Sequence, residues 1–380
     1  MAYRISTKCI HLEQQEAGCD MSGAISFPIY QTATFAHPSL GESTGYDYSR
    51  LQNPTREQVE RVVAGLEEGT DGVAFSSGMA AIGAVMELFS PGDHLIVDED
   101  LYGGSVRLFS AISKKNGLEI VRINLAVESA EKYITEKTRG IFLETPTNPM
   151  MNVVDIESVA TVAKKHDLLL IVDNTFLSPY LQNPLKLGAD IVVHSGTKYL
   201  GGHNDTLAGF VVTGKAELGE KIRYISKTTG ATLAPLDSWL ILRGIKTLGL
   251  RMEKAGQNAF HLARWLEERR EVVRVIYPGL PDHPGHMVMK KQARGFGAML
   301  TFEVESRQLV EKILHKVKLI LFAESLGGVE TLITYPVTQT HADVPKESLA
   351  KNGINDCVLR LSVGIEDITD LLADLEQAFS

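Results

Sequence analysis

The sequence predicts an α/β fold, in which a large domain built on a mainly parallel sheet is followed by a smaller α+β domain. Short apolar runs alternate with helical patterns through the middle of the chain, which is typical of βαβ units. The runs are almost uniformly apolar, as expected for strands that are covered on both faces. After about residue 245 the pattern changes to nearly alternating strands and amphipathic helices, which indicates a second domain.

Residues 1–48 contain many turn and polar residues and little periodicity, so we expect an N-terminal arm there. The large domain then covers residues 49–245, and the C-terminal α+β domain covers residues 246–380. No internal repeat or low-complexity tract is visible.

Two helices and six strands are expected in the large domain. "TREQVERVVAGLEEG" places Val59, Val62, Val63 and Leu66 on one helical stripe, and Gly69 is a plausible stop. "SGMAAIGAVMELF" reads as a small-residue helix closed by the Pro-Gly pair that follows. The expected strands are 71–75, 93–98, 140–145, 168–173, 190–195 and 208–214.

The C-terminal domain reads as a mixture of helices and strands. "KAGQNAFHLARWLEER" predicts an amphipathic helix, and "DITDLLADLEQAF" predicts the closing helix. "GAMLTFEVE" and "VLRLSVGIED" predict strands between them.

The composition is that of an ordinary globular protein, with 44% hydrophobic and 22% charged residues. The net charge is −9, and no stretch collects enough Lys and Arg to bind a phosphate backbone. The first residues lack the apolar core of a signal peptide, and the longest apolar runs are far shorter than a membrane span. We therefore expect a cytoplasmic protein with neither a nucleic-acid nor a membrane partner.

The cysteines and histidines suggest no metal site. Cys9, Cys19 and Cys357 are too few for a disulfide framework and are expected to be reduced thiols. "DHPGH" (282–286) reads as a loop because no third ligand is obvious, and no role is assigned to His203.

The stretch "IVVHSGTKYLGGHND" (191–205) contains a candidate catalytic residue, Lys198. Lys198 follows a buried-looking strand and is surrounded by hydroxyls and glycines. Ligands of open α/β sheets bind beyond the carboxyl ends of the strands, where a desolvated lysine can attack a carbonyl. Taken alone, such a lysine is more often a solvated surface residue.

Residues at two other strand ends favour a catalytic role for Lys198 over a surface role. Asp173 ends "LLLIVD", where a carboxylate could keep a pyridine nitrogen protonated, although a turn or cap role is equally open. In "FSSGMAA" the backbone N–H groups of Ser77, Gly78 and Met79 meet the positive end of a helix dipole and form a phosphate seat. Ser195 and Thr197 could donate hydroxyls to the same phosphate. A lysine, a carboxylate and a phosphate seat on one sheet suit pyridoxal 5′-phosphate (PLP).

The chain resembles the Cys/Met-metabolism family of PLP enzymes, which includes cystathionine γ-synthases, γ-lyases and β-lyases and methionine γ-lyases. The resemblance covers nearly the whole chain and implies the fold-type I (aspartate aminotransferase-like) transferase architecture. It is carried by "YDYSRLQNPTR", "FSSGMAA", "DLYGGSVRLF", "ETPTNP", "VDNTF", "HSGTKYLGGHND", "RGIKTL", "FAESLGGVETLITYP" and "LRLSVGIED".

The resemblance implies a role for each matching residue. Lys198 is the lysine that binds the cofactor covalently and moves protons, and Asp173 is the partner of the pyridine nitrogen. Tyr102 stacks on the cofactor ring and is a candidate acid or base. The substrate α-carboxylate is bound by Asn148 and Arg360, the latter through its planar fork, and Ser325 positions Lys198 and the substrate.

The resemblance also implies an oligomer whose active sites are shared between subunits. Tyr48 and Arg50 would reach the cofactor phosphate of the neighbouring subunit, and the usual assembly is a tetramer made of two closely joined dimers. A Tyr and an Arg on an arm would otherwise be ordinary surface residues.

Three charged residues bear on the substrate. Asp47 and Arg107 match positions that surround the distal amino-acid end of cystathionine in γ-synthases and γ-lyases, and Glu324 matches an acidic position typical of enzymes that work at Cγ. Methionine γ-lyases commonly have a cysteine where this chain has Gly104. We therefore expect a cystathionine γ-lyase or γ-synthase of sulfur amino-acid metabolism, acting by γ-elimination or γ-replacement.

Several alternatives stay open. β-Lyases of the family can carry the same "TYPVTQTHADVP" stretch (334–345), and methionine γ-lyase or O-acetylhomoserine sulfhydrylase activity is also compatible with the family. An aminotransferase would share the lysine and aspartate but not "ESLGGVE". A non-catalytic regulator on this fold should have lost Lys198, Asp173 or Arg360, and all three are present.

Overall fold

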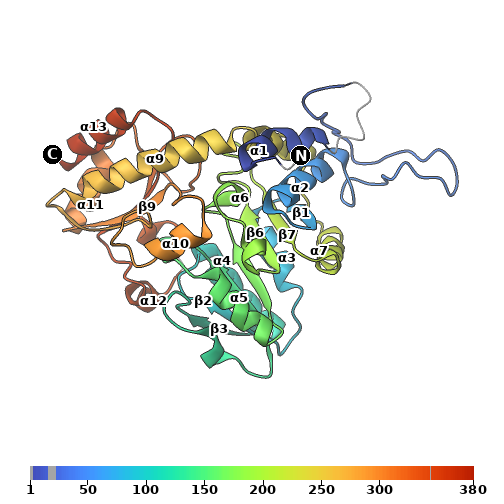
Figure 1. Ribbon diagram of the computed structural model, residues 1–380, viewed down its shortest axis with the longest axis horizontal. Helices are drawn as coiled ribbons and strands as arrows, with labels where there is room; N and C mark the ends of the chain where they lie inside the picture. Colours follow the sequence, from blue (N-terminus) through green and yellow to red (C-terminus); the bar gives the residue numbers. More distant parts are fainter. Residues whose placement is uncertain (1–2, 16–22, 343) are drawn as a thin grey trace.

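The protein is built around a seven-stranded sheet and a five-stranded sheet, in a computed structural model that describes residues 3–15, 23–342 and 344–380 (Figure 1). The large sheet has the strand order β1-β7-β6-β5-β4-β2-β3. Only β7 runs antiparallel to its neighbours, β1 and β6, and all other pairs are parallel. Its strands are β1 (Asp71–Phe75), β2 (His94–Asp98), β3 (Glu119–Ile123), β4 (Thr138–Glu144), β5 (Leu169–Asp173), β6 (Ile191–Ser195) and β7 (Gly209–Thr213).

All six strands expected from the sequence are present, and β3 is an additional one. Strands β2, β4, β5, β6 and β7 are buried along almost their whole length, because helices cover both faces of the sheet. Strand β3 lies at the edge of the sheet and is only partly buried, with the sequence EIVRI. An edge strand needs fewer apolar residues, which explains why its sequence gave no strong signal.

Helices pack on both faces of the large sheet. Side chains of α3 (Gly78–Met86), α4 (Gly103–Asn116) and α7 (Ala216–Thr229) share a hydrophobic cluster with one face. Side chains of α2 (Pro54–Glu67) and α5 (Ile156–Lys165) pack on the other.

The expected helix at "TREQVERVVAGLEEG" is α2. It begins after Asn53, whose side chain accepts hydrogen bonds from the N–H groups of Thr55 and Arg56, and it has proline at the first helical position. It ends at Glu67, one residue before a left-handed Glu68 and two before Gly69. The expected small-residue helix is α3, which ends at Met86.

The N-terminal segment includes one helix that the sequence pattern did not indicate. Helix α1 (Ile5–Gln15) packs against α2 and α9, and Cys9 is only 4% exposed. Cys19 lies outside the described residues. Residues 23–53 follow as an irregular segment, part of which extends away from the body of the molecule (Figure 1).

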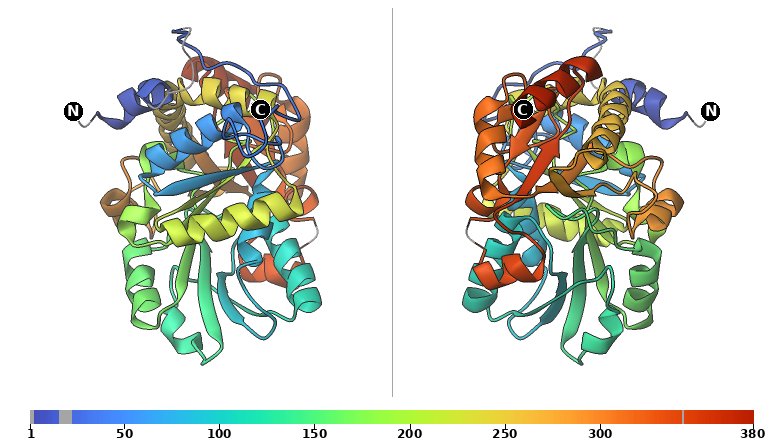
Figure 2. Two further views of the ribbon diagram at one scale, coloured as in Figure 1. Left: turned by 90° about the vertical axis from the view of Figure 1, so that its right-hand side faces the viewer. Right: turned by 90° about the vertical axis from the view of Figure 1, so that its left-hand side faces the viewer.

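The five-stranded sheet belongs to the C-terminal part of the chain and has the order β10-β11-β12-β9-β8. Helices α9, α11 and α13 pack together beside it, and Figure 2 shows this orange and red part next to the green and cyan sheet. Its strands are β8 (Val272–Ile276), β9 (Met299–Val304), β10 (Leu321–Phe322), β11 (Leu332–Thr334) and β12 (Val358–Ser362), and its helices are α9 (Leu248–Glu267), α11 (Arg307–Lys316) and α13 (Ile368–Phe379). The remaining described helices are α6 (Ser178–Leu181), α8 (Pro235–Ile245), α10 (His286–Gln292) and α12 (Lys346–Lys351), with 3₁₀ turns at Ala130–Tyr133, Pro184–Leu187 and Pro336–Thr338.

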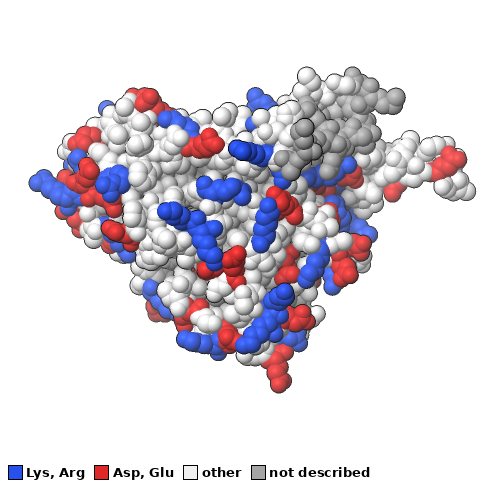
Figure 3. All heavy atoms as spheres, in the orientation of Figure 1, with Lys and Arg blue, Asp and Glu red and all other residues white. Residues whose placement is uncertain are grey.

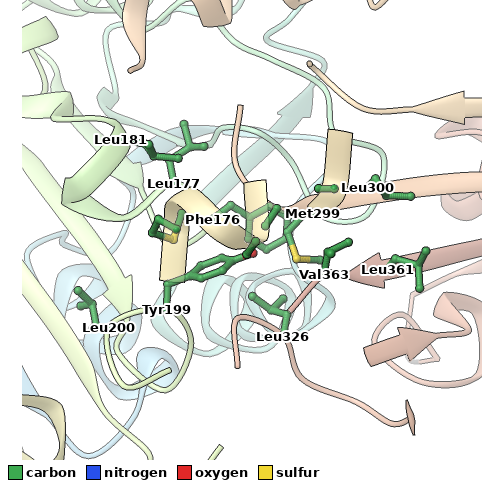
Figure 4. Close-up of a cluster of buried hydrophobic side chains, with 14 of the residues drawn as sticks. Phe176, Leu177, Leu181, Tyr199, Leu200, Met299, Leu300, Leu326, Leu361 and Val363 are labelled. Carbon is green, nitrogen blue, oxygen red and sulfur yellow. The ribbon is translucent and has the colours of Figure 1, made fainter. Parts of the chain in front are cut away.

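A continuous hydrophobic core joins the two sheets. Figure 4 shows Phe176 and Tyr199 from the large-sheet region gathered with Met299, Leu326 and Val363 from the C-terminal part. The boundary near residue 245 stays a prediction, since side chains from both sides of it share this cluster.

Charged groups of both signs are interspersed over the face drawn in Figure 3. Across the ranges that the structure describes, no helix combines the length and apolarity needed to traverse a lipid bilayer.

Candidate active site

The carboxyl ends of the large-sheet strands open onto a cavity of about 360 Å³. The parallel strands β4, β5 and β6 end at this edge with Glu144, Asp173 and Ser195, and the antiparallel β7 begins there with Gly209. Twelve of the residues expected to form the site line the cavity, namely Ser77, Gly78, Met79, Tyr102, Asn148, Asp173, Ser195, Thr197, Lys198, Glu324, Ser325 and Arg360.

Lys198 reaches the cavity from the turn after β6. Its Nζ donates a hydrogen bond to Ser325 Oγ at 2.8 Å. Burial and the charge of Arg360 together lower the pKa of the Lys198 amine to about 8, with Glu324 acting in the opposite direction. The amine is therefore partly neutral near physiological pH and can act as a nucleophile or a base.

The "ESLGG" segment packs directly against Lys198 and Tyr199. Ser325 has φ 95°, a left-handed conformation that is costly for a residue with a side chain. Two residues later, Gly327 has φ 77°, and a Cβ there would lie 2.8 Å from Tyr199 N and 3.0 Å from Lys198 C. Only glycine fits this contact, which explains the first glycine of the pair in the motif.

The start of α3 forms a cradle for an anion. Ser77 caps the helix by accepting a hydrogen bond from Ala80 N at 3.1 Å. The N–H groups of Gly78 and Met79 have no acceptor within the helix because these residues begin it. A Cβ at Gly78 would lie 2.8 Å from Ser195 Cβ and 3.0 Å from its Oγ. The missing side chain thus lets backbone and hydroxyl donors converge where the helix dipole is positive.

Asp173 ends β5 and is held by Thr175. Its Oδ1 accepts hydrogen bonds from Thr175 N at 3.0 Å and Thr175 Oγ1 at 2.5 Å. Burial raises the pKa of Asp173, while Thr175 and His194 lower it. A cationic ring nitrogen placed against this carboxylate would offset the unfavourable burial of its charge.

Glu144 is the main residue that the sequence reasoning missed. It ends β4 directly beside Asp173 in the sheet, and its Oε2 accepts a hydrogen bond from Tyr102 N at 2.9 Å. Burial, reinforced by the charge of Asp173, raises the pKa of Glu144 well above its usual range. Its position at the end of a strand, within "ETPTNP", was the signal that could have identified it. Ile82, Thr175, Phe176, Leu207, Leu326 and Thr340 also line the cavity and were not anticipated.

Arg360 and Asn148 are already paired on the cavity wall. Arg360 is fully buried, and its Nη1 donates to Asn148 Oδ1 at 2.8 Å. Its Nη2 donates to Ser325 O at 2.9 Å and to Thr334 Oγ1 at 3.1 Å, while its Nε has no hydrogen-bond acceptor within the described residues. Burial lowers the pKa of Arg360 to about 10, so the guanidinium stays charged and can bind a carboxylate.

Four of the expected residues do not line the cavity of this chain. Asp47 lies in a separate groove, and Arg50 donates from Nη1 to Lys227 O at 2.5 Å while its guanidinium sits 5.8 Å from the Tyr48 ring centre. Arg107 is exposed on α4. Asp47, Tyr48 and Arg50 lie in the irregular segment before α2.

The histidines singled out in the sequence make local contacts. His203 pairs through Nδ1 with Gly201 O at 2.8 Å, and the His283 ring accepts a hydrogen bond from Gly285 N at 3.0 Å. Within the ranges that the structure describes, no group of three or more His, Cys, Asp or Glu side chains is placed to bind a metal.

Comparison with known proteins places these features in context. Residues 6–380 match the family model for Cys/Met metabolism PLP-dependent enzymes. The chain is 50% identical to a cystathionine gamma-lyase of Bacillus subtilis (strain 168), over 95% of this chain and 96% of that one. It is 48% identical to a cystathionine beta-lyase of Lactococcus lactis subsp. cremoris (strain MG1363), over 94% of each.

The fold also matches that of solved structures. The crystal structure of a cystathionine gamma synthase from Xanthomonas oryzae pv. oryzae in complex with cystathionine superposes with a TM-score of 0.96 and 39% identity. The superposition covers 100% of this chain and 98% of that chain.

Proposed function

The chain belongs to the Cys/Met-metabolism family of PLP-dependent enzymes, and from this premise we propose that it cleaves or forms bonds at Cγ, as a cystathionine γ-lyase or γ-synthase. That it is a PLP-dependent enzyme of the cystathionine type, acting on carbon–sulfur bonds with the fold-type I architecture, follows from its relatives. The choice of Cγ and the roles of individual residues are the proposal.

The cavity has the groups that PLP requires. The N–H groups of Gly78 and Met79, with the Ser195 hydroxyl beside them, suit its phosphate, and Asp173 suits its ring nitrogen. Lys198, the one lysine among the residues lining the cavity, suits its aldehyde. Bound PLP supplies an electron sink that stabilises negative charge at the substrate Cα.

The chain's own residues would then bind the substrate and move protons. Arg360 and Asn148 would hold the α-carboxylate, which fixes Cα near the Lys198 amine. The amine, with its lowered pKa, would take the α-proton, and its hydrogen bond to Ser325 Oγ orients it. Tyr102 would stack on the ring and exclude water from one of its faces.

The position of Glu324 is the observation that carries the assignment to Cγ. Glu324 lines the cavity next to Ser325, and its charge raises the pKa of Lys198. Departure of a group from Cβ needs only the α-proton removed, whereas departure from Cγ needs a further proton removed from Cβ. A carboxylate that favours the protonated form of the shuttling amine supports this longer sequence of proton transfers.

Gly104 bears on the methionine γ-lyase alternative. A Cβ at this position would lie 2.4 Å from Tyr102 Cε1 and 3.0 Å from Met79 Sδ. A cysteine there would displace the Tyr102 ring, so the site is shaped around glycine. β-Elimination, as in the L. lactis relative, and O-acetylhomoserine sulfhydrylase activity are the remaining alternatives.

Analysis of the keto acid released from cystathionine tests the proposal. γ-Elimination with water gives 2-oxobutyrate, ammonia and cysteine, whereas β-elimination with water gives pyruvate, ammonia and homocysteine. We expect 2-oxobutyrate from cystathionine, or from an O-acyl-homoserine if the enzyme is a γ-synthase. Release of pyruvate alone from cystathionine would overturn the assignment to Cγ.

The assembly belongs to the same proposal. Tyr48 and Arg50 do not line the cavity of their own chain, and we propose that they complete the phosphate site of a second subunit in a homodimer, two of which form a tetramer. A cytoplasmic location is also proposed, and it is supported by the described cysteines, Cys9 and Cys357, which are free thiols.

A further inference from the structure

The loop described at residues 336–342 and 344–345 connects the C-terminal sheet with the large-sheet side of the cavity. It follows β11 and is braced by a hydrogen bond from His341 N to Pro336 O at 3.0 Å. Near its end, Val344 is buried in the same hydrophobic cluster as Leu101 and Phe109. The loop is therefore anchored at both ends, one in each part of the molecule.

The loop touches the first residue of α4 backbone to backbone. A Cβ at Gly103 would lie only 2.1 Å from Thr340 O, and Thr340 itself lines the cavity. Tyr102, the proposed stacking residue, is the residue immediately before Gly103. The position of the loop and the start of α4 are thus coupled by direct contact.

The His341 side chain makes a second and more specific connection. It is 2% exposed, and its Nε2 lies 3.1 Å from Asn148 O and 3.3 Å from Leu101 O. Carbonyl oxygens only accept hydrogen bonds, so Nε2 carries the proton and donates to both. Nδ1 is then the acceptor for the Thr340 hydroxyl at 2.8 Å.

The charge state of the ring agrees with these contacts. Burial and the charge of Arg360 lower the pKa of His341 to about 4, so the ring is neutral at physiological pH. Asn148 is consequently held at two points by the C-terminal part, at its side chain by Arg360 and at its carbonyl by His341.

We propose that His341 is a positioning residue of the active site, whose Nε2–H holds together the Leu101 and Asn148 carbonyls and so fixes where Tyr102 and Asn148 face the cavity. The inference rests on the roles proposed above for Tyr102 and Asn148. The alternative is that His341 only stabilises the fold, as many buried histidines do.

A matched pair of substitutions separates these roles. In His341→Gln the amide nitrogen comes close to the place of Nε2 and can still donate to the carbonyls, whereas in His341→Asn it comes close to the place of Nδ1 and cannot reach them. Val344→Ala is the control for stability, because it removes buried methyl groups of the same loop without touching either carbonyl.

We expect the Asn variant to raise KM for the amino-acid substrate about tenfold, and the Gln variant to stay within about threefold of the parent. We also expect the visible circular dichroism of the bound cofactor to change in the Asn variant alone, because that signal depends on the ring's surroundings. Val344→Ala should lower Tm and leave KM and the dichroism unchanged.

Parent-like KM and dichroism in the Asn variant, or equal changes in the Asn and Gln variants, would overturn the proposal. If the Asn variant does not fold, Thr340→Val replaces it, since loss of the hydroxyl frees the ring at Nδ1, and parent-like dichroism there would again overturn it. The dichroism of the holoenzyme requires no substrate, so a failure of the assignment to Cγ would not affect this readout.

Discussion

Lys198 shows how surroundings prepare one side chain for chemistry. Burial lowers the pKa of its amine to about 8, with the charge of Arg360 acting in the same direction. A lysine in water is almost entirely charged at neutral pH, so the cavity makes a neutral amine available at little cost. Its hydrogen bond to Ser325 Oγ then sets its direction.

This environment predicts how the apoenzyme takes up PLP as the pH changes. Below pH 8 the amine is mainly an ammonium group without a lone pair, and above it the amine is mainly neutral. We therefore expect the rate at which the absorbance band of bound PLP appears to rise about tenfold from pH 6 to pH 7 and to level off above about pH 9. Rapid-mixing absorbance measurements on the apoenzyme give this rate. Lys198→Arg should develop no such band, and a rate independent of pH would contradict the lowered pKa.

Glu324 and Arg107 make separate predictions about the substrate. Glu324 lines the cavity, and Glu324→Ala should raise KM for cystathionine about tenfold more than for a small substrate without the distal amino-acid group. Arg107→Ala tests the expectation from the sequence that this guanidinium binds the distal carboxylate, although Arg107 is exposed on α4 and does not line the cavity. Steady-state kinetics with cystathionine and with the small substrate measure the difference. If a variant changes KM equally for the two substrates, the replaced residue does not bind the distal group.

The site residues could be predicted to different extents. Lys198 and Asp173 follow or end strands, where their chemistry is conspicuous in the sequence, whereas Arg360, on the buried strand β12, was identified only through the family resemblance. Glu144 was not predicted because its importance depends on a neighbouring strand, which places its carboxyl beside Asp173. Pairing between strands distant in sequence is not visible in a single strand's pattern.

At the scale of elements, α3 and β7 together build the anion cradle. Strand β7 begins at Gly209, and a Cβ there would lie 2.0 Å from Ser77 O and 2.8 Å from Gly78 N. The absence of a side chain on β7 is therefore what lets the start of α3 sit at the sheet edge.

Gly209→Ala should displace the start of α3 and weaken PLP binding. We expect the Kd for PLP to rise at least about tenfold, because the N–H groups of Gly78 and Met79 would no longer converge on the phosphate. Gly214→Ala is the matched control, since its Cβ would meet its nearest atoms at 3.7 Å, an ordinary contact. Titration of each apoenzyme with PLP gives the Kd. The same Kd in both variants would show that the cradle does not depend on this contact.

The elements that the sequence predicted share one property, which is burial on a regular face. Strands β4, β5 and β6 and helix α2 show the apolar runs or stripes that such burial requires. Strand β3 and helix α1 escaped detection because the first lies at an edge and the second has a weak, mostly polar pattern. The 336–345 loop lacks periodicity altogether, so its attachment to the cavity could not be predicted.

At the scale of the whole molecule, the cavity combines residues from both parts of the chain. Lys198 and Asp173 come from the large sheet, whereas Ser325 and Arg360 come from the C-terminal part. The continuous hydrophobic core around Tyr199 fixes the positions of these groups relative to one another (Figure 4). Tyr48 and Arg50 of the N-terminal segment, by contrast, do not line the cavity of their own chain.

Mixed oligomers test the shared site. Arg50→Ala should retain PLP poorly and Lys198→Ala should be inactive, but a dimer of the two has one site with both residues intact. Random mixing should restore about a quarter of the parent activity, because half of the dimers carry one such site. Activity is measured after the subunits are unfolded together, refolded and shown to be mixed. An inactive mixture of verified hybrid oligomers would mean that each site is built within one chain.

The link between Lys198 and PLP is the claim on which every other role depends. The purified holoenzyme is treated with borohydride, which fixes the link irreversibly, and is then digested and analysed by peptide mass spectrometry. We predict that the yellow band is lost and that the cofactor is found on the peptide containing Lys198, while Lys198→Ala is folded, inactive and unlabelled. Labelling of a different lysine, or turnover by Lys198→Ala, would contradict the account.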